Sequence, residues 1–194
     1  MRLSRLVLTV LALALLTSAA PSAGWADEPH QENSINVNPI GVLFGSYSLN
    51  FEHLFAEQHG LLAEGTFATS SSGTTSTVDG GFAVGYRWHW SKSQNSGFLG
   101  ANLGYRLGSA KATVDSSTFD LNVSVPYAVF NIGRRFAWDF GLNVTLRAGL
   151  GRGFYSISST STNPNVQSAI KTVEDVYNRI PVVLDGEVSI GYDF

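Results

Sequence analysis

The sequence predicts an all-β fold: an eight-stranded antiparallel up-and-down transmembrane β-barrel with one helix in the last extracellular loop. Three observations support this prediction. Apolar and polar residues alternate strictly in several segments, the connections alternate between short and long, and aromatic residues gather near the short connections. A period of two indicates strands with one dry and one polar face. All three features together favour a barrel whose dry face meets lipid.

Alternation is clearest in the last ten residues, DGEVSIGYDF. Val188, Ile190, Tyr192 and Phe194 share one parity, and polar or small residues occupy the other. The same pattern recurs in four earlier segments, which begin at Tyr47, Gly81, Phe98 and Phe140. Residues 60–70 alternate weakly. Residues 119–138 change phase near Pro126, where we expect a β-bulge.

The connections between these segments alternate in length. Short links fall at 56–60, at 91–96 and around Asp139, whereas longer Ser/Thr-rich links fall at 69–80, 108–118 and 158–181. Short turns at one end and long loops at the other are typical of an outer-membrane barrel.

The strand count follows from the position of the termini. Both termini lie on the short-turn side only if the number of strands is even. Residues 34–55 are therefore expected to hold two strands, bent near Phe44-Gly45-Ser46, which gives eight. One long strand there would give seven.

The first 26 residues have the three-part form of a secretory signal peptide: two arginines, an apolar run and small residues before Asp27. A membrane anchor is the alternative, but the apolar run is shorter than the roughly 20 residues that a spanning helix needs. We expect residues 27–33 to be a short periplasmic segment and residues 34–194 to form the barrel, located in the outer membrane of a Gram-negative bacterium.

The composition of the chain argues against several classes of function. Removing Arg2 and Arg5 leaves 10 of the 12 basic residues against all 15 acidic ones, a formal charge of −5. This balance argues against a nucleic-acid partner. The chain has no cysteine, so neither disulfides nor thiolate metal sites are available. We expect no cofactor and no metal site.

Aromatic residues gather near the short links. Trp88, Trp90 and Trp138 lead this set, which we interpret as a girdle at the periplasmic membrane interface. The alternative fold is a soluble β-sandwich in the periplasm. Such a fold does not explain why the tryptophans lie at one end of the strands.

One segment has helical periodicity. Asn163-Pro164 is typical of a helix start, and apolar residues then recur at helical spacing up to Pro181. We expect an amphipathic helix over 163–180, lying over the barrel mouth or at the outer interface. It would serve as a loop cover or as a partner-binding element.

Charged residues fall on the parity that faces the lumen. The expected lumenal network comprises Glu52, Glu64, Arg87, His89, Arg106, Arg135, Arg147, Asp185 and Glu187. Isolated buried charges are costly, and the interior of an eight-stranded barrel is just wide enough for side chains to fill it. We therefore expect a plugged barrel held by internal salt bridges. A narrow ion path along these charges is the alternative.

The pair His89 and Ser91 shares one strand face, a spacing that resembles the catalytic pair of outer-membrane lipid A deacylases. Such a hydrolase needs an acid to orient the histidine. No acid follows Ser91 until Asp115. We therefore expect no catalytic residues and interpret His89 as a lumenal histidine bonded to a carboxylate.

Two segments resemble known proteins. GEVSIGYDF resembles the C-terminal strand that outer-membrane proteins present to the barrel-assembly machinery, which implies Tyr192 and Phe194 as the assembly signal. INVNPIGVLFGSYSLNFEHLF is similar to the first hairpin of a family of small outer-membrane barrels of unassigned function, with Asn38-Pro39, Gly45 and Glu52 at matching positions. This family implies no catalytic residues.

We expect a protein of structural or surface-interaction type whose partners are the lipid bilayer, lipopolysaccharide and, during biogenesis, the assembly machinery. The sequence does not name an external ligand or protein for the loops. The alternatives are a narrow small-solute channel and, with less support, a lipid A-modifying hydrolase.

Overall fold

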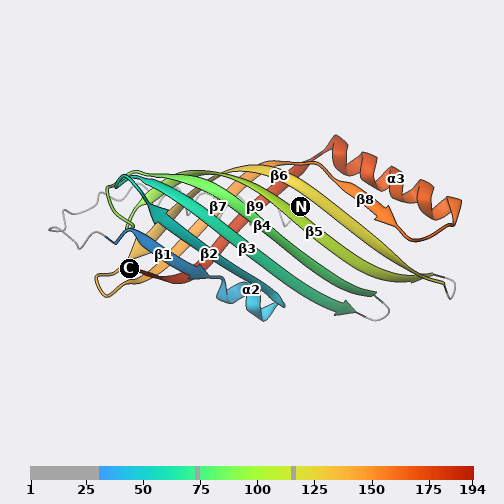
Figure 1. Ribbon diagram of the computed structural model, residues 1–194, viewed down its shortest axis with the longest axis horizontal. Helices are drawn as coiled ribbons and strands as arrows, with labels where there is room; N and C mark the ends of the chain where they lie inside the picture. The colour runs from blue at the N-terminus through green and yellow to red at the C-terminus, as the bar shows by residue number, and fades with distance from the viewer. Residues whose placement is uncertain (1–30, 73–74, 115–116) are drawn as a thin grey trace, which may run out of the picture.

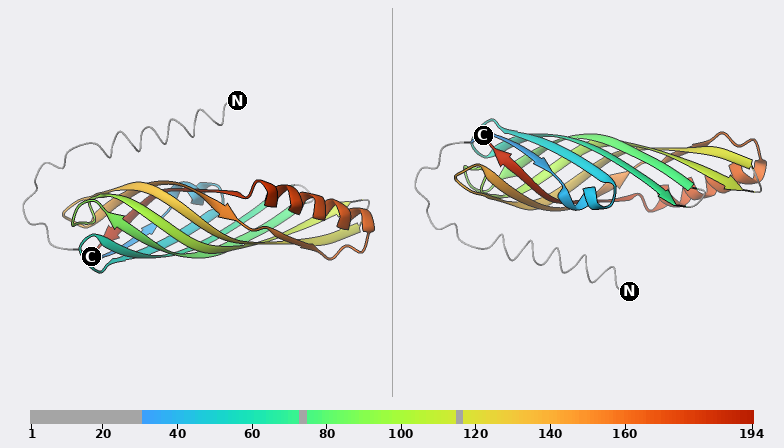
Figure 2. Two further views of the ribbon diagram at one scale, coloured as in Figure 1. Left: turned by 90° about the horizontal axis from the view of Figure 1, so that it is seen from above. Right: turned by 90° about the horizontal axis from the view of Figure 1, so that it is seen from below.

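The chain folds into a closed barrel of antiparallel strands, shown from the side in Figure 1 and from two further directions in Figure 2. The computed structural model describes residues 31–72, 75–114 and 117–194. The expected signal peptide, residues 1–26, lies outside the described residues, as does most of the segment 27–33. The described strands are β1 (Asn33–Val37), β2 (Ser46–Leu54), β3 (His59–Ser72), β4 (Thr75–His89), β5 (Gly97–Val114), β6 (Ser117–Ala137), β7 (Leu142–Gly153), β8 (Ser156–Ser159) and β9 (Val182–Asp193), and the described helices are α2 (Pro39–Leu43) and α3 (Pro164–Arg179).

Strand pairing follows the order of the chain around the whole wall. Neighbouring strands pair antiparallel, and β1 closes the ring by pairing with β9 from Ser34 to Val37. β7 and β8 occupy one strand position in the wall, because both pair with β6: β7 pairs with residues 127–137 of β6, and β8 pairs with residues 121–124. The wall therefore has eight strand positions, and the predicted eight-stranded antiparallel up-and-down barrel is confirmed.

The two faces of the wall have opposite chemistry. Along β4, Phe82, Val84 and Tyr86 are exposed on the outside, whereas Ala83 and Arg87 are buried inside. Successive side chains of a strand point to opposite faces, so this alternation assigns each residue to one environment. The outer face of the other strands carries further exposed apolar residues, including Phe51, Leu61, Leu103, Phe130, Leu150, Leu184 and Val188.

The predicted pair of strands at 34–55 is confirmed, with a short helix between them that the alternation did not reveal. Asn38 caps α2 by accepting a hydrogen bond from the Gly41 amide at 2.9 Å, and Pro39 occupies its first turn. Gly45 ends the turn at a φ of +72°, in the left-handed region that favours glycine. α2 lies against β2 and β9 at the level where β1 ends.

The bulge expected near Pro126 is wrong. β6 pairs with β5 in unbroken register, with Pro126 opposite Tyr105. The apparent change of phase is an inversion of polarity: Val123 and Val125 lie on the inner face of this half of β6, and polar side chains lie outside. Proline has no N–H group to donate to a neighbouring strand. Pro126 stands beside the gap between β7 and β8, where the strand pairing is already interrupted, and its carbonyl accepts a hydrogen bond from the Phe154 amide.

Two of the three long links are also different from the prediction. Residues 69–80 and 108–118 belong to the hairpins β3–β4 and β5–β6, whose strands pair as far as residues 72 and 114. Residues 73–74 and 115–116 lie outside the described residues. Serine and threonine occupy both faces of these hairpin strands, so the sequence lacks the alternation that would distinguish them from a loop. Only 158–181 is a long connection.

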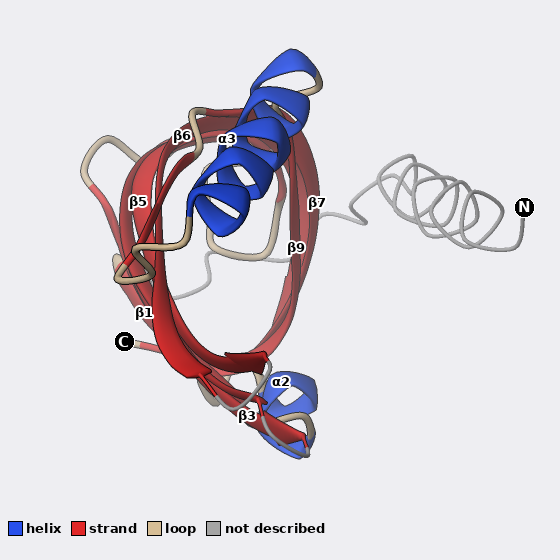
Figure 3. Ribbon diagram, turned by 90° about the vertical axis from the view of Figure 1, so that its right-hand side faces the viewer, coloured by secondary structure: helices blue, strands red, loops and turns tan. Residues whose placement is uncertain are grey.

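The helix expected over 163–180 is confirmed as α3, with Asn163 as its N-cap. Viewed end-on, α3 lies across one side of the barrel mouth (Figure 3). Asn178 exchanges two 2.8 Å hydrogen bonds with the backbone of Tyr155, and Glu174 accepts from the Ile157 amide at 3.0 Å. These contacts satisfy backbone groups that β9 does not reach, because β9 begins at Val182. No helix among the described residues is both long and apolar enough to cross a membrane.

We predict that Asn178→Ala will loosen α3. The substitution removes both hydrogen bonds to Tyr155 and is expected to cost about 1–2 kcal/mol of local stability. Hydrogen exchange should accelerate at the 155 and 157 amides and along α3, while the β4–β5 amides stay protected. Asn165→Ala, on the exposed first turn of the same helix, is the matched control and should exchange like wild type. Unchanged exchange in Asn178→Ala would contradict this docking.

Candidate functional site

The lumen near the short turns is built around one carboxylate. Glu52, on β2, is fully buried, as are the two arginines that bind it. Its Oε2 accepts hydrogen bonds of 2.8 Å from Arg87 Nη1 and from Arg135 Nη2. His89 Nε2 lies 2.8 Å from the other oxygen, Oε1. Arg87 and His89 stand two residues apart on β4 and therefore share its inner face.

A second centre forms around Arg147, on β7. Its guanidinium lies 2.8 Å from Glu64, 2.9 Å from Asp185 and 3.0 Å from Glu187. Glu187 also lies 3.3 Å from Arg87 and thereby joins the two centres. We refer to the eight residues of the two centres as the lumenal charge network: Glu52, Glu64, Arg87, His89, Arg135, Arg147, Asp185 and Glu187.

The network contains four carboxylates and three arginines, so its charges almost cancel. Removing an ion from water costs several kcal/mol, and only close pairing with further hydrogen bonds offsets that cost. Neutral side chains supply some of those bonds: Asn50 donates to Glu187 at 2.6 Å, and Arg135 donates to Thr145 at 3.0 Å. The network therefore depends on strands from every part of the chain being held in register.

Glycine makes room for the network at one critical place. A Cβ at Gly60 would lie 2.2 Å from Glu52 Oε1, which no side chain could tolerate without displacing the carboxylate. Gly60 stands on β3 opposite Leu54, two residues from Leu62, which is opposite Glu52, and it lies just after the turn. The backbone of β3 thus approaches the carboxylate closely because position 60 has no side chain.

The turn at 90–96 folds back into the barrel end. Gln94 is buried and accepts a hydrogen bond from Arg135, and its amide donates to the Glu32 carbonyl. Phe98 is fully buried, with the Arg87 guanidinium 4.4 Å from the centre of its ring. Gln94 was not predictable from alternation, because a turn residue belongs to no alternating pattern. The neutral inner-face residues were not predicted as site residues, although their parity is that of the charged ones; they include Asn36, Asn50, Asn143 and Thr145.

Arg106 is the one predicted network residue that the structure places elsewhere. It lies toward the α3 end of the lumen, with its guanidinium 5.2 Å from the centre of the Tyr127 ring. Within the described residues, no carboxylate lies at ion-pair distance from it. Arg106 is therefore not part of the lumenal charge network.

His89 and Ser91 do not meet as a catalytic pair. His89 faces Glu52 inside the barrel, whereas the Ser91 hydroxyl donates to the Asn95 carbonyl within its own turn. In the part of the chain that the structure describes, no three His, Asp or Glu side chains gather in a way that could hold a metal ion.

The residues expected to form a girdle and an assembly signal lie at the short-turn end. Trp88 and Trp138 are exposed on the outer face, whereas Trp90 is half-buried, with its indole ring directly over Gly97. Tyr192 and Phe194 are exposed outside as well. The backbone of Phe194 exchanges two 2.9 Å hydrogen bonds with Asn33, so the last residue takes part in barrel closure.

Together, fold and site define a closed antiparallel barrel that is apolar outside and charged inside. No family model and no curated protein matches the chain. Among solved structures, CarO2 of Acinetobacter baumannii is similar with a TM-score of 0.46 and 9% identity, covering 84% of this chain and 97% of its own. CarO of the same organism has a TM-score of 0.44 and 9% identity, covering 87% and 100%.

We predict that Glu52→Gln will destabilise the barrel strongly. The neutral amide keeps the shape of the carboxylate but leaves Arg87 and Arg135 without their shared counter-ion. Breaking a buried pair in this way costs about 3–5 kcal/mol. Equilibrium unfolding in urea, with the protein refolded in detergent, measures the loss.

The matched control is Glu57→Gln, which makes the same change in an exposed turn where Glu57 pairs with Lys92. Exposed pairs contribute little, so this variant should unfold like wild type. Equal unfolding midpoints for the two variants would show that the network does not stabilise the barrel.

Proposed function

We propose that this protein is an outer-membrane β-barrel of structural or surface-interaction type, whose lumen is plugged by the lumenal charge network. One observation carries the proposal: a closed wall exposes apolar side chains all around its outside while it buries paired charges at its centre. A protein dissolved in water has the opposite arrangement, with charges outside and apolar groups within.

The outer face supports the membrane assignment. Phe82, Leu103 and Phe130 are each more than 60% exposed, although they stand in the middle of regular strands. Contiguous apolar surface of this extent marks a lipid or protein contact. A closed barrel also suits hydrocarbon because the strand pairing leaves no open sheet edge around the ring. In this orientation the short turns face the periplasm and α3 faces the cell exterior.

The interior supports the plugged state. Arg87 and Arg135 are fully buried, and Arg147 is 5% exposed, so the long side chains fill the cross-section instead of standing in open water. Gln94 and Phe98 add bulk at the periplasmic end. An eight-stranded barrel has an interior of about this capacity.

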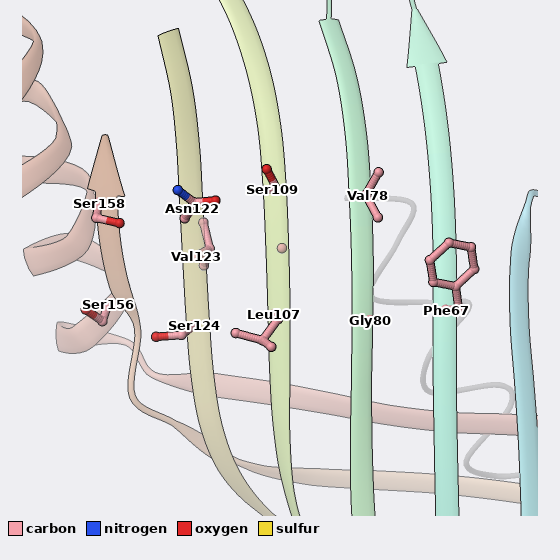
Figure 4. Close-up of a pocket in the computed structure, with 11 residues that line it drawn as sticks. Phe67, Val78, Gly80, Leu107, Ser109, Asn122, Val123, Ser124, Ser156 and Ser158 are labelled. Atoms are coloured by element: carbon pink, nitrogen blue, oxygen red, sulfur yellow. The ribbon is translucent and has the colours of Figure 1, made fainter. Parts of the chain in front are cut away.

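The exterior end supports a role in surface interaction. The hairpins β3–β4 and β5–β6 extend toward the same end of the barrel as α3, which stands beside β8 (Figure 1). A hollow of about 410 Å³ lies on the wall toward this end. Figure 4 shows the apolar side chains of Phe67, Val78 and Leu107 on one side of this hollow and the hydroxyl groups of Ser124 and Ser156 on the other, with Leu107 beside Ser124. At the outer surface of the membrane, hydrocarbon is replaced by lipopolysaccharide headgroups. The change from apolar side chains to hydroxyl groups in the hollow fits this boundary.

We predict that the wild-type protein will not conduct ions. The refolded mature chain should show heat-modifiable migration on a gel, as expected of a barrel that resists detergent until boiled. In planar bilayers it should produce no discrete openings. A variant that combines Glu52→Ala, Arg87→Ala and Arg135→Ala removes the centre of the network and should conduct if it inserts. Reproducible single-channel steps from the wild-type protein would overturn the plugged state in favour of a narrow channel.

We predict that Phe194→Ala will impair assembly. Phe194 directly follows β9, pairs with Asn33 through its backbone and carries the aromatic ring that the assembly machinery is expected to recognise. The amount of heat-modifiable protein in the outer membrane should fall several-fold, and degradation should rise. Phe140→Ala removes an exposed aromatic ring at the same end of the barrel and is the matched control. Wild-type levels of the Phe194 variant would contradict the assembly role.

A further inference from the structure

A cavity of about 200 Å³ occupies the lumen at the α3 end, above the lumenal charge network. Its lining combines the guanidinium of Arg106, the ring of Tyr127 and the carboxylate of Asp79 with apolar side chains. This volume is below the roughly 300–1,000 Å³ that drug-sized ligands occupy, so a ligand would have to be small.

The apolar part of the lining consists of three valines. Closer to the short turns, the inner face carries the charge network together with single apolar residues such as Leu54, Leu62 and Phe98, whereas here Val123, Val125 and Val183 line one cavity. Val125 is 7% exposed and Val183 is 5% exposed, so they form a packed wall. This wall accounts for the polarity inversion along β6. Apolar residues turned inward at the watery end of a barrel provide contact area for an apolar group.

The charged part of the lining is Arg106. Each of the three arginines in the network has carboxylate partners within 3.3 Å, whereas Arg106 has none among the described residues. Arg106 is half-buried, and its guanidinium lies 5.2 Å from the centre of the Tyr127 ring and hydrogen-bonds that side chain. A guanidinium has five N–H donors, so others remain for an anion. Guanidinium groups bind carboxylates through two parallel hydrogen bonds.

We propose that this cavity is a binding site for a small monocarboxylate with a short branched or cyclic apolar body. The carboxylate lies against Arg106, and the apolar body lies against the three valines. The network closes the lumen below, so the ligand enters and leaves from the cell exterior. The cavity is therefore a receptor-like site, a role beyond the structural and surface role proposed above.

Asp79 restricts the ligand to a single negative charge. Asp79 stands on the inner face of β4, opposite Gly108 of β5. Arg106 is two residues from Gly108 on the same face of β5, opposite Gly81, so Asp79 and Arg106 are diagonal neighbours. A second carboxylate on the ligand would face Asp79 and be repelled. Asp79 also competes with the ligand for Arg106, so neutralising it should strengthen binding.

Isovalerate is the probe, tested with the refolded mature chain in detergent by saturation-transfer NMR. Isovaleramide, which has the same shape without the charge, is the ligand control. Isovalerate should receive saturation from the protein, and Arg106→Gln should weaken its binding at least tenfold. Arg152→Gln is the matched protein control, because Arg152 also lies 5.2 Å from an aromatic ring, that of Phe154, but on the outer face. It should bind like wild type.

Two further variants keep the test decisive if Arg106→Gln fails to fold. Gly108→Val fills the cavity: a Cβ there would make ordinary contacts of 3.4 Å with Asp79 and 3.9 Å with Val123, so folding should survive and binding should be lost. Asp79→Asn should bind isovalerate more tightly than wild type. Equal binding of the amide, absent saturation transfer, or unchanged binding in the folded Gly108 variant would each overturn the proposal. None of these outcomes depends on whether the lumen conducts.

Discussion

The structure depends on one constraint: every backbone donor and acceptor in the wall must find a partner within the wall itself. A sheet meets this constraint by closing on itself, because a closed ring has no open edge with unpaired backbone groups. Closure is made by β1 and β9, which share only the pairs from Ser34 to Val37, extended by the two hydrogen bonds between Asn33 and Phe194. Beyond Val37, α2 takes the place of a strand and lies against β9. A similar substitution occurs at the mouth, where Asn178 and Glu174 of α3 bind backbone groups beyond the reach of β9.

Closure determines what can lie inside. Once the ring is shut, the inner side chains of eight strands share one narrow space, and their charges must neutralise one another there. Glu52 meets two arginines and a histidine from two distant strands, and Arg147 meets three carboxylates. The same close packing explains why position 60 carries glycine. Toward the exterior the charges give way to valines and Arg106, so one lumen contains a closed lower part and a small cavity above it.

Much of the fold is predictable because a period of two appears in the sequence wherever the outer face of a strand is apolar and its inner face is polar. The parity of β4, β5, β7 and β9, the two strands at 34–55 and the helix after Asn163 all follow from local patterns. The errors arise where that contrast disappears. Serines and threonines on both faces of the hairpin strands resemble a loop in the sequence, and the inverted polarity near Pro126 resembles a bulge.

The sequence by itself determined which side chains face outward and which face the lumen, because that depends only on alternation along a single strand. Of the nine residues that it marked as a charge network, eight meet inside the barrel. Only the tertiary structure decided which charges pair, because pairing depends on the register and stagger between strands far apart in the chain. The same register separated Arg106 from the network and placed it beside Tyr127, and it brought Gln94 back into the barrel end. Contacts of that kind arise from closure in three dimensions and leave no periodic trace along the chain.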